Sequence, residues 1–350
     1  MSNRQAASIP MRSVGPVKLT HAGVETDVMV PMATFETPLW PSTSRGARVT
    51  HLAGGISTTL IDDQMSRSIV VETNTAQEAA KILRELEQRQ TEISQVVTTN
   101  SRYARFKALH TQLVGNLIYC RLSINTADAS GHNMVTQAAE HLMNWLLATY
   151  PQLRHVSLSA NYCTDKKVSA VNGILGRGKY VVAEVLIPEA LCQQQLRTDA
   201  KKLVDLHIKK NLVGSILAGS LRSANAHFAN MLLAIYLATG QDAANIIEAS
   251  QGMVHAEARP EGLYFSVTLP NLIVGTIGNG KDLDFARENL AAMGCLTEAE
   301  AGLDSQKLAC IIAATVLCGE LSLLAALTNP GELMRSHLGI ERRAKEVKHA

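Results

Sequence analysis

The sequence predicts an α+β or α/β fold, and three observations lead to that prediction. Strand-like and helical patterns alternate along the chain, there is no internal repeat, and 46% of the 350 residues are hydrophobic. Helices are expected over residues 79–88, 134–148, 189–206, 226–239 and 308–327, and strands over residues 117–124, 155–159, 180–187 and 263–269. A chain of this length buries a large core, and about two domains are expected.

The expected elements carry local signals. The first helix begins at a capping box, in which Thr75 is followed by Glu78. Residues 117–124 alternate between the two faces of a half-buried strand. Residues 180–187 are rich in valine, which favours a strand. Pro188 suits the first turn of the amphipathic helix expected to follow it.

The two most apolar segments are expected to be buried helices. Residues 226–239 and 308–327 are hydrophobic on nearly every face of a helix. Gly319 and Glu320 interrupt the second segment, which fits a helix inside a protein core better than a membrane span. Residues 1–13 lack the apolar core of a signal peptide. We therefore expect a soluble, cytoplasmic protein without a membrane partner.

Composition disfavours some classes of function. The chain has 33 Lys and Arg and 31 Asp and Glu residues, so its formal net charge is +2, which does not favour nucleic-acid binding. The six cysteines show neither CxxC pairs nor metal-ligand spacing. We expect them to be reduced thiols that pack as small apolar residues, and we expect no metal site.

The densest group of polar side chains is the segment 159–167, SANYCTDKK, which follows an expected strand. An ammonium group on this loop could stabilise a developing oxyanion or hold a substrate carboxylate, and Lys166 and Lys167 both carry one. A solvated charged loop is the alternative. Asp242, just after a buried helix, is expected to need a lysine partner, with a helix cap as the alternative.

Two glycine-spaced segments favour close approach of the backbone to a phosphate. Residues 128–133, DASGHN, precede a helix N-terminus, and residues 275–280, GTIGNG, form a second loop. Ordinary turns are the alternative, since neither segment is GxGxxG. Glu36 lies among apolar residues, where a carboxylic acid can act as a general acid. His337 could donate a proton; surface positions are the alternative for both of these residues.

Taken together and in this order, these segments resemble 3-hydroxy-3-methylglutaryl-CoA (HMG-CoA) reductase. The similarity extends from Pro31 to His337 and includes KNLVGS at 210–215 and NAHFAN at 225–230. The SxNYCTDKK string at 159–167 is highly specific. The GQDA segment at 240–243 and the Ser-His pair that ends at His337 follow at compatible spacings.

The resemblance implies an α+β fold in which a large, mainly helical domain surrounds a central buried helix. Residues 1–66 and 172–350 would form this domain, which binds substrate and CoA and forms the dimer. Residues 67–171 would form a small, inserted, ferredoxin-like domain that binds the nicotinamide cofactor. A homodimer or a higher even oligomer is implied, with active sites at the subunit interface.

The resemblance also implies an activity, the reduction of HMG-CoA to mevalonate and CoA by two successive hydride transfers from NADPH. Lys166 would stabilise the carbonyl oxygen, and Asp242 would hydrogen-bond Lys166 and tune its charge. Glu36 would take part in proton delivery to mevaldehyde, and His337 would protonate the departing CoA thiolate. The chemistry needs such groups because hydride attack builds negative charge on oxygen.

Further residues match binding positions of the family. The cofactor would contact Ser101, Arg102, Asp128, Ala129, Ser130, Gly131, His132, Asn133, Gly275, Thr276 and Gly278. The substrate and CoA would contact Ser42, Arg45, Arg67, Ser159, Asp165, Lys167, Lys210, His227 and Asn230. Ser101 and Arg102 match a pair that meets the 2′-phosphate in NADPH-using relatives, so NADPH is expected in preference to NADH. Ser130 and His132 depart from the family, which usually has methionines there.

Three other functions stay open at this point. The same chemistry could run in reverse with NAD+ and consume mevalonate. Lys166 could be a Schiff-base nucleophile in a lyase, which requires a lowered pKa. A non-enzymatic CoA- or anion-binding protein would bind ligand without oxidising NADPH. The joint presence of Glu36, Lys166, Asp242 and His337 speaks against this last function.

Overall fold

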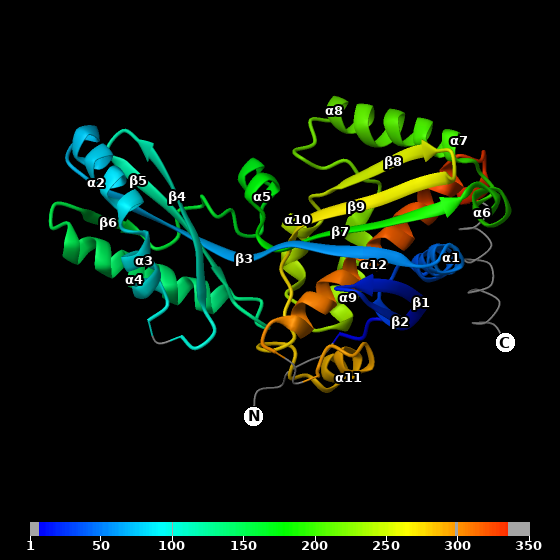
Figure 1. Ribbon diagram of the computed structural model, residues 1–350, viewed down its shortest axis with the longest axis horizontal. Coiled ribbons are helices and arrows are strands. Elements are labelled where there is room, and N and C mark those ends of the chain that lie inside the picture. The colour runs from blue at the N-terminus through cyan, green and yellow to red at the C-terminus, as the bar shows by residue number, and fades with distance from the viewer. Residues whose placement is uncertain (1–6, 100, 298–299, 335–350) are drawn as a thin grey trace.

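The computed structural model of the protein describes residues 7–99, 101–297 and 300–334. A larger and a smaller body, each with helices packed on strands, lie side by side and share the long strand β3 (Ile56–Glu72) (Figure 1). Each body has its own cluster of buried apolar side chains. The prediction of a mixed helix and strand fold is confirmed, because the helices accompany a mixed sheet of 9 strands.

The larger body is built on strands in the order β2-β1-β3-β7-β9-β8. The strands besides β3 are β1 (Met11–His21), β2 (Val24–Ala33), β7 (Gly178–Pro188), β8 (Met253–Arg259) and β9 (Gly262–Leu272). All neighbours pair antiparallel except β1 and β3, which are parallel. Strands β7 and β9 confirm the predictions for residues 180–187 and 263–269.

Helix α12 (Leu303–Leu327) runs through the larger body and is buried along most of its length. By length and composition it could cross a membrane, but 94% of its most apolar window is buried inside the protein. It packs against α1 (Leu39–Leu52) at Gly46, where a Cβ atom would lie 1.9 Å from the Cys318 carbonyl oxygen. Residues 308–327 therefore form the buried helix that the sequence predicts. The six cysteines are buried free thiols, as expected.

The smaller body contains an antiparallel sheet in the order β4-β5-β3-β6. Its other elements are α2 (Ala76–Gln88), α3 (Gln90–Val97), β4 (Arg105–Val114), β5 (Leu117–Asn125), α4 (His132–Thr149) and β6 (Arg154–Ser157). The capping box is present: the Glu78 N–H donates to the Thr75 hydroxyl at 3.2 Å, and the Glu78 carboxylate accepts from the Asn74 N–H at 3.1 Å.

The prediction of a single helix over residues 189–206 is wrong. The chain forms α6 (Glu189–Leu191), η1 (Cys192–Leu196) and α7 (Ala200–Leu206) instead. Arg197 interrupts the helix with a φ of 56°, a left-handed conformation that cannot continue a right-handed helix. Asp199 then starts α7, because its side chain accepts a hydrogen bond of 2.8 Å from the Lys202 N–H.

Seven further helical elements complete the described part of the chain. They are α5 (Ala170–Leu175), η2 (His207–Gly214), α8 (Ser215–Leu217), α9 (Phe228–Ala238), η3 (Ala243–Asn245), α10 (Ile246–Ala249) and α11 (Asp284–Ala292). Helix α9 is the other buried helix that the sequence predicts. It leads into η3 and α10, and α10 packs against α9 and β9.

Candidate active site

The segment 159–167 forms a loop after β6 that is anchored to β3. The Cys163 N–H donates a hydrogen bond of 3.0 Å to the Ser68 hydroxyl of β3. Three residues of the loop, Lys166 among them, have φ between 48° and 59°. This left-handed conformation is uncommon for residues other than glycine. The loop is therefore tightly wound, with Lys166 in one of its turns.

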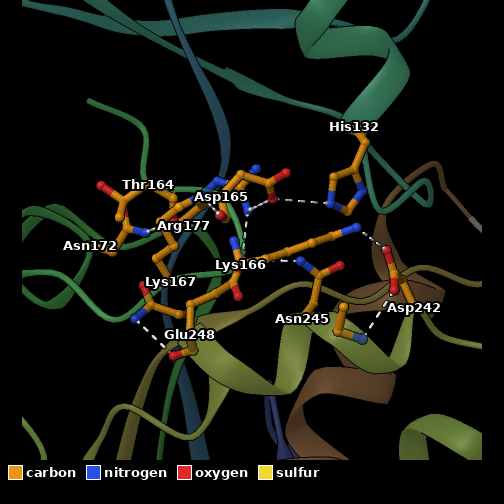
Figure 2. A network of polar contacts seen from close by, with 12 residues as sticks. His132, Thr164, Asp165, Lys166, Lys167, Asn172, Arg177, Asp242, Asn245 and Glu248 are labelled. Carbon is orange, nitrogen blue, oxygen red and sulfur yellow. Dashed lines mark hydrogen bonds and ion pairs between the residues drawn. The ribbon is translucent and has the colours of Figure 1, made fainter. Parts of the chain in front are cut away.

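Lys166 contacts Asp242, which is the partnership expected from the sequence. Its Nζ lies 2.8 Å from Asp242 Oδ2 (Figure 2). The other carboxylate oxygen accepts from the Ala244 N–H at 3.1 Å, so Asp242 also caps η3. The hydrogen bond that Lys166 donates to Asp242 raises the pKa of Lys166, against an opposing effect of burial. Burial alone would raise the pKa of Asp242, but its hydrogen bonds with Lys166 and Ala244 produce a net lowering. Both groups are therefore charged at neutral pH.

A buried ion pair supports this loop and was not predicted from the sequence. Arg177 Nη1 lies 2.9 Å from Glu248 Oε1 and 3.0 Å from Asp165 Oδ1, and the Arg177 and Glu248 side chains are 1% and 0% exposed. Glu248 Oε1 also accepts hydrogen bonds of 3.0 Å from the Lys166 N–H and from Asn245 Nδ2. In the sequence, only the glycines on either side of Arg177 form a recognisable pattern. No local pattern indicates that Arg177 and Glu248 are in contact.

His132, the first residue of α4, is directed toward the same network (Figure 2). Its Nε2 lies 3.8 Å from Asp165 Oδ1. Burial, reinforced by the charge of Arg177, lowers the pKa of His132 to about 4. The imidazole is therefore neutral at neutral pH and offers one donor and one acceptor nitrogen.

A cavity of about 590 Å³ lies beside the Lys166–Asp242 pair. It is lined by Ala129, Ser130, Gly131, His132, Asn133, Met134, Lys166, Gly240, Gln241, Asp242, Ile277, Gly278, Asn279, Gly280 and Lys281. The cavity thus joins the N-terminus of α4, the charged pair and the loop that contains Gly278. The two glycine-spaced segments meet here, because Ala129 and Ile277 form a parallel bridge.

Glycines allow these segments to come together. A Cβ atom at Gly275 would lie 2.4 Å from the backbone nitrogen of Ser130, and one at Gly131 would lie 2.6 Å from the Thr126 side chain. Gly278 has a φ of 95° and open space at its Cβ position. The arrangement leaves backbone accessible at the start of α4, where N–H groups favour an anion.

Some expected cofactor residues lie beside this cavity rather than in its wall. Asp128 turns its carboxylate to the N-terminus of α12 and accepts hydrogen bonds from the Gly302 N–H at 2.7 Å and the Ser305 N–H at 3.0 Å. The Thr276 N–H donates to the Asp128 carbonyl at 2.8 Å. Asp128, Gly275 and Thr276 therefore hold the two loops together.

Ser101 and Arg102, which precede β4, also lie outside the cavity wall. The Ser101 hydroxyl accepts a hydrogen bond of 3.0 Å from the Ala104 N–H, and the Arg102 carbonyl accepts one of 2.9 Å from Arg105. The Arg102 side chain is exposed. It is consequently accessible to an anion approaching the smaller body.

A second group of candidates surrounds the N-terminal end of α9. Asn230 Nδ2 donates to Glu36 Oε2 at 2.8 Å. The His227 N–H donates at 3.1 Å to Glu320, a fully buried carboxylate that in the sequence only interrupts an apolar segment. Burial raises the pKa of Glu320 to about 7 and lowers that of His227 to about 4. The charge of Lys210 acts on both groups, so Lys210 belongs to this neighbourhood.

The two groups lie at opposite ends of α9. Asn230 is in its first turn, Asp242 follows its last, and a helix of 11 residues spans ~16 Å. Within the part of the chain that the structure describes, no hydrogen bond or ion pair joins Glu36 to Lys166 or Asp242. One chain therefore brings together Lys166, Asp242 and Asp165, with Glu36 apart from them.

The candidates for CoA binding lie on α1. The hydroxyl oxygens of Ser42 and Ser322 are 3.1 Å apart, and Arg45 Nη1 lies 2.8 Å from Glu332 Oε1. Arg45 also lines a groove of about 640 Å³, together with Arg48 and other residues of α1. This groove is distinct from the cavity beside Lys166.

Arg67, Ser159 and Lys167 lie on β3 and on the wound loop. Lys167 Nζ donates to the Asp165 carbonyl at 3.1 Å, and the Ser159 N–H donates to the Ser157 hydroxyl at 3.1 Å. Arg67 is half-buried, and its Nε has no hydrogen-bond partner among residues 7–99, 101–297 and 300–334. His337 lies outside the described residues, so its expected role stays a prediction.

Comparison with known proteins identifies relatives along nearly the whole chain. The family described as Hydroxymethylglutaryl-coenzyme A reductase matches residues 5–342. The chain is 41% identical over 334 residues to 3-hydroxy-3-methylglutaryl-coenzyme A reductase of Aeropyrum pernix, covering 95% of this chain and 79% of that protein. It is 40% identical over 332 residues to the enzyme of the same name from Pyrococcus horikoshii, covering 94% and 80% respectively.

Solved structures also share the fold. The class II 3-hydroxy-3-methylglutaryl-CoA reductase from Streptococcus pneumoniae, solved bound to NADPH, superposes with a TM-score of 0.73 at 20% sequence identity. The alignment covers 94% of this chain and 88% of that one. At this level of identity the likeness concerns the fold.

Proposed function

Because the chain belongs to the hydroxymethylglutaryl-coenzyme A reductase family, we propose that it reduces HMG-CoA to mevalonate and CoA. The observation that carries the proposal is the 2.8 Å contact between Lys166 Nζ and Asp242 Oδ2 at the wall of the cavity. A lysine kept protonated by a carboxylate, with room beside it for a ligand, is suited to stabilising negative charge on a carbonyl oxygen. Each HMG-CoA would consume two NADPH and two protons.

The proposed reductant is NADPH, bound between the N-terminus of α4 and the loop that contains Gly278. Residues 129–134 line the cavity there, and the N–H groups of the first turn of α4 favour the diphosphate. When bound, the cofactor supplies hydride to the carbonyl carbon of the substrate. Arg102, with Ser101, is assigned to the 2′-phosphate, because an exposed guanidinium suits a phosphate monoester.

Lys166 would donate a hydrogen bond to the thioester oxygen in the first reduction and to the aldehyde oxygen in the second. Asp242 keeps Lys166 protonated, since their hydrogen bond raises the pKa of the lysine. The free carboxylate of HMG-CoA needs cations and hydrogen-bond donors, and the candidates to provide them are Arg67, Ser159, Lys167, Lys210, His227 and Asn230. Asp165 would hold the Lys166 loop, and Ser42 and Arg45 would contact CoA.

Two acids would donate protons at different stages of the reaction. Glu36 would take part in protonating the mevaldehyde oxygen, and Asn230 would orient it through their 2.8 Å hydrogen bond. His337 would protonate the departing CoA thiolate, because a thiolate leaves more easily with an acid beside it. This role rests on the resemblance of the Ser-His segment to the family.

We propose that the active site is shared between two subunits of a homodimer or a higher even oligomer. Helix α9, which is ~16 Å long, supports this proposal, because the Glu36–Asn230 contact lies at its first turn and Asp242 follows its other end. We infer that Glu36 and Lys166 of one chain serve different sites. Exposed apolar side chains on η2 and α8 offer an interface. They are Ile208, Leu212, Val213, Ile216 and Leu217, with exposures from 38% to 88%.

The proposed cofactor domain corresponds to the smaller body, and the proposed substrate domain corresponds to the larger body. Residues 67–171 would form the inserted cofactor domain, and residues 1–66 and 172–350 the large substrate domain around α12. The order β3-α2-β4-β5-α4-β6, with sheet order β4-β5-β3-β6, supports a ferredoxin-like topology for the inserted part, with α3 as an addition. We place the enzyme in the cytoplasm, where it would make mevalonate for isoprenoid precursors.

Two alternative activities differ in testable ways. The reverse reaction with NAD+ would use the same side chains, so only the cofactor preference and direction separate it from the proposal. A Schiff-base lyase needs a lysine with a lowered pKa, and the pKa of Lys166 is raised. Borohydride with substrate should therefore trap no adduct at Lys166.

The decisive experiment measures NADPH and NADH oxidation by the purified protein, with and without HMG-CoA, together with mevalonate formation. We expect oxidation that depends on HMG-CoA, two NADPH consumed per mevalonate, and a preference for NADPH. Lys166→Ala should abolish turnover and leave the fold and the dimer intact, while Lys201→Ala on the surface of α7 is the matched control. Substantial turnover by the Lys166 variant would refute the mechanism.

A further inference from the structure

Glu248 is a fully buried carboxylate at which three hydrogen-bond donors converge. Its Oε1 accepts from Arg177 Nη1 at 2.9 Å and from Asn245 Nδ2 and the Lys166 backbone N–H at 3.0 Å each. The side chain is 0% exposed. Burying a carboxylate is unfavourable unless charged and hydrogen-bonding partners surround it. The arrangement therefore fixes the partners of Glu248 relative to one another.

The partner that matters for chemistry is Lys166. Its φ of 54° lies in the left-handed region, which residues with a side chain seldom adopt unless their surroundings impose it. The backbone N–H of Lys166 donates to Glu248, while its side-chain Nζ contacts Asp242. Glu248 thus binds the backbone of the residue whose side chain is directed toward Asp242 (Figure 2).

The same carboxylate connects both halves of the Lys166–Asp242 pair. Arg177 bridges Glu248 and Asp165, the residue before Lys166. Asn245 bonds Glu248 and also donates its N–H to the Asp242 carbonyl at 3.0 Å, within the turn that Asp242 caps. Loss of Glu248 would therefore loosen the wound loop and the turn after α9 at the same time.

We propose that Glu248 is a positioning residue for Lys166, which acts by binding the Lys166 backbone and by adding negative charge behind the lysine. The inference rests on the proposed function, in which Lys166 stabilises the carbonyl oxygen. The charged and titratable groups that face Lys166 are Asp242 before η3, Asp165 on the loop, Glu248 on α10, His132 on α4 and Arg177 before β7. Asp242, Asp165 and Glu248 each raise the pKa of Lys166.

Two substitutions separate the contributions of Glu248. Glu248→Ala removes both the acceptor and the charge, and kcat should fall about 100-fold while the KM for HMG-CoA changes less than about threefold, because a misplaced reacting group mainly affects the transition state. Glu248→Gln keeps an acceptor for the Lys166 N–H, and kcat should fall only about tenfold. Its activity should decline at lower pH than that of the wild type, because a negative charge is lost. Glu184→Gln, a half-buried carboxylate that contacts Tyr264 of β9, is the control.

A second measurement does not depend on turnover. Acetic anhydride acylates only unprotonated amines, so the pH dependence of Lys166 labelling, followed by peptide mass spectrometry, reports its pKa directly. In Glu248→Gln the midpoint for Lys166 should move to lower pH by more than the midpoint for exposed Lys167, the internal reference. Thermal unfolding of each variant shows whether it is folded.

The outcomes distinguish the two proposals. Folded Glu248 variants with kcat within twofold of the wild type, or an unchanged Lys166 labelling midpoint in Glu248→Gln, would overturn the positioning role. A shifted midpoint in a protein whose wild type never oxidises NADPH with HMG-CoA would support the role of Glu248 and refute the proposed function.

Discussion

The Asn230 amide donates a hydrogen bond of 2.8 Å to the Glu36 carboxylate at the end of α9 remote from Asp242. This contact joins the segment after β2 to the first turn of α9. The pair is solvent-accessible in a single chain, whereas Lys166 and Asp242 lie beyond the other end of the same helix. We propose that a site in which Glu36 and Lys166 act on one substrate is formed by two chains.

Mixing two inactive variants tests this arrangement. Glu36→Gln and Lys166→Ala should each lose nearly all activity as homodimers. In a heterodimer of the two, one site carries both substitutions and the other carries neither. A randomly reassociated equal mixture should therefore recover about a quarter of the wild-type activity.

The control mixture combines Lys166→Ala with Asp242→Ala. Because these residues contact each other within one chain, every site of that heterodimer keeps a defect and no activity should return. Recovery in this control, or none in the first mixture, would show that the assignment of side chains to subunits is wrong.

Asp242→Asn should move the loss of activity at high pH to lower pH. The hydrogen bond with Asp242 is the largest cause that raises the pKa of Lys166 above 10.5, and burial opposes it. Without the carboxylate charge the lysine loses its proton at lower pH, and the ammonium form is the one that we propose to be active. We expect a kcat about 100-fold lower at neutral pH and an earlier decline in a pH–rate profile. Asp205→Asn on the exposed face of α7 should leave the profile unchanged.

The sequence predicts the long elements best. Helices α4, α9 and α12 and strands β7 and β9 have apolar patterns long enough to be recognised locally. Strand β1 escapes recognition because Gly15 and Pro16 interrupt its alternation where its register shifts against β2. The pairing of β3 with partners in both bodies depends on tertiary contacts, so no local pattern contains it.

Part of the candidate site could also be predicted from local sequence, and part could not. Lys166 and Asp242 stand in recognisable segments, and their contact is expected on the premise that Asp242 is buried and needs a cation. The contact is present, but the Asp242 side chain is 47% exposed. Arg177 and Glu248 could not be predicted as a pair, since each lies in an ordinary segment and they meet only through folding. The separation of Glu36 from Asp242 also depends on the length and direction of α9, which no local pattern contains.

Arg102→Ala should raise the KM for NADPH more than the KM for NADH. Only NADPH carries the 2′-phosphate that the exposed guanidinium of Arg102 is proposed to bind, and a charge-assisted pair of this kind contributes about 1.5–3 kcal/mol, or roughly 10- to 100-fold. Initial rates with both cofactors give the ratio. Arg154→Ala, an exposed arginine of the smaller body that pairs with Glu72, is the control. An unchanged ratio would contradict the assignment.

Asp63→Ala should be much more destabilising than Asp62→Ala. Asp63 lies 3.3 Å from Lys179, with side chains only 8% and 3% exposed, whereas Asp62 lies 2.9 Å from Lys107 with 30% and 41% exposure. Removing Asp63 leaves a buried ammonium without its carboxylate, which lowers the free energy of unfolding by about 3–5 kcal/mol. An exposed pair contributes about 0–1 kcal/mol. Urea unfolding of both variants provides the comparison, and similar losses would contradict the burial argument.

His207→Gln should make the protein less sensitive to mild acid. Burial lowers the pKa of His207 to about 4, with a smaller effect from the charge of His255, and its Nδ1 faces the Asn211 amide at 3.2 Å. Between pH ~6.5 and ~4 the unfolded chain therefore binds a proton at this site that the folded chain excludes, so stability falls as the pH falls through this window.

For one such histidine the loss of unfolding free energy between pH 7 and pH 5 is about 2 kcal/mol. Glutamine has no proton to gain, so the difference in unfolding free energy between the two pH values should shrink by about that amount in the variant. The same substitution at exposed His155 should leave the wild-type difference in place, and an equal effect at both positions would show that burial of His207 is not the cause.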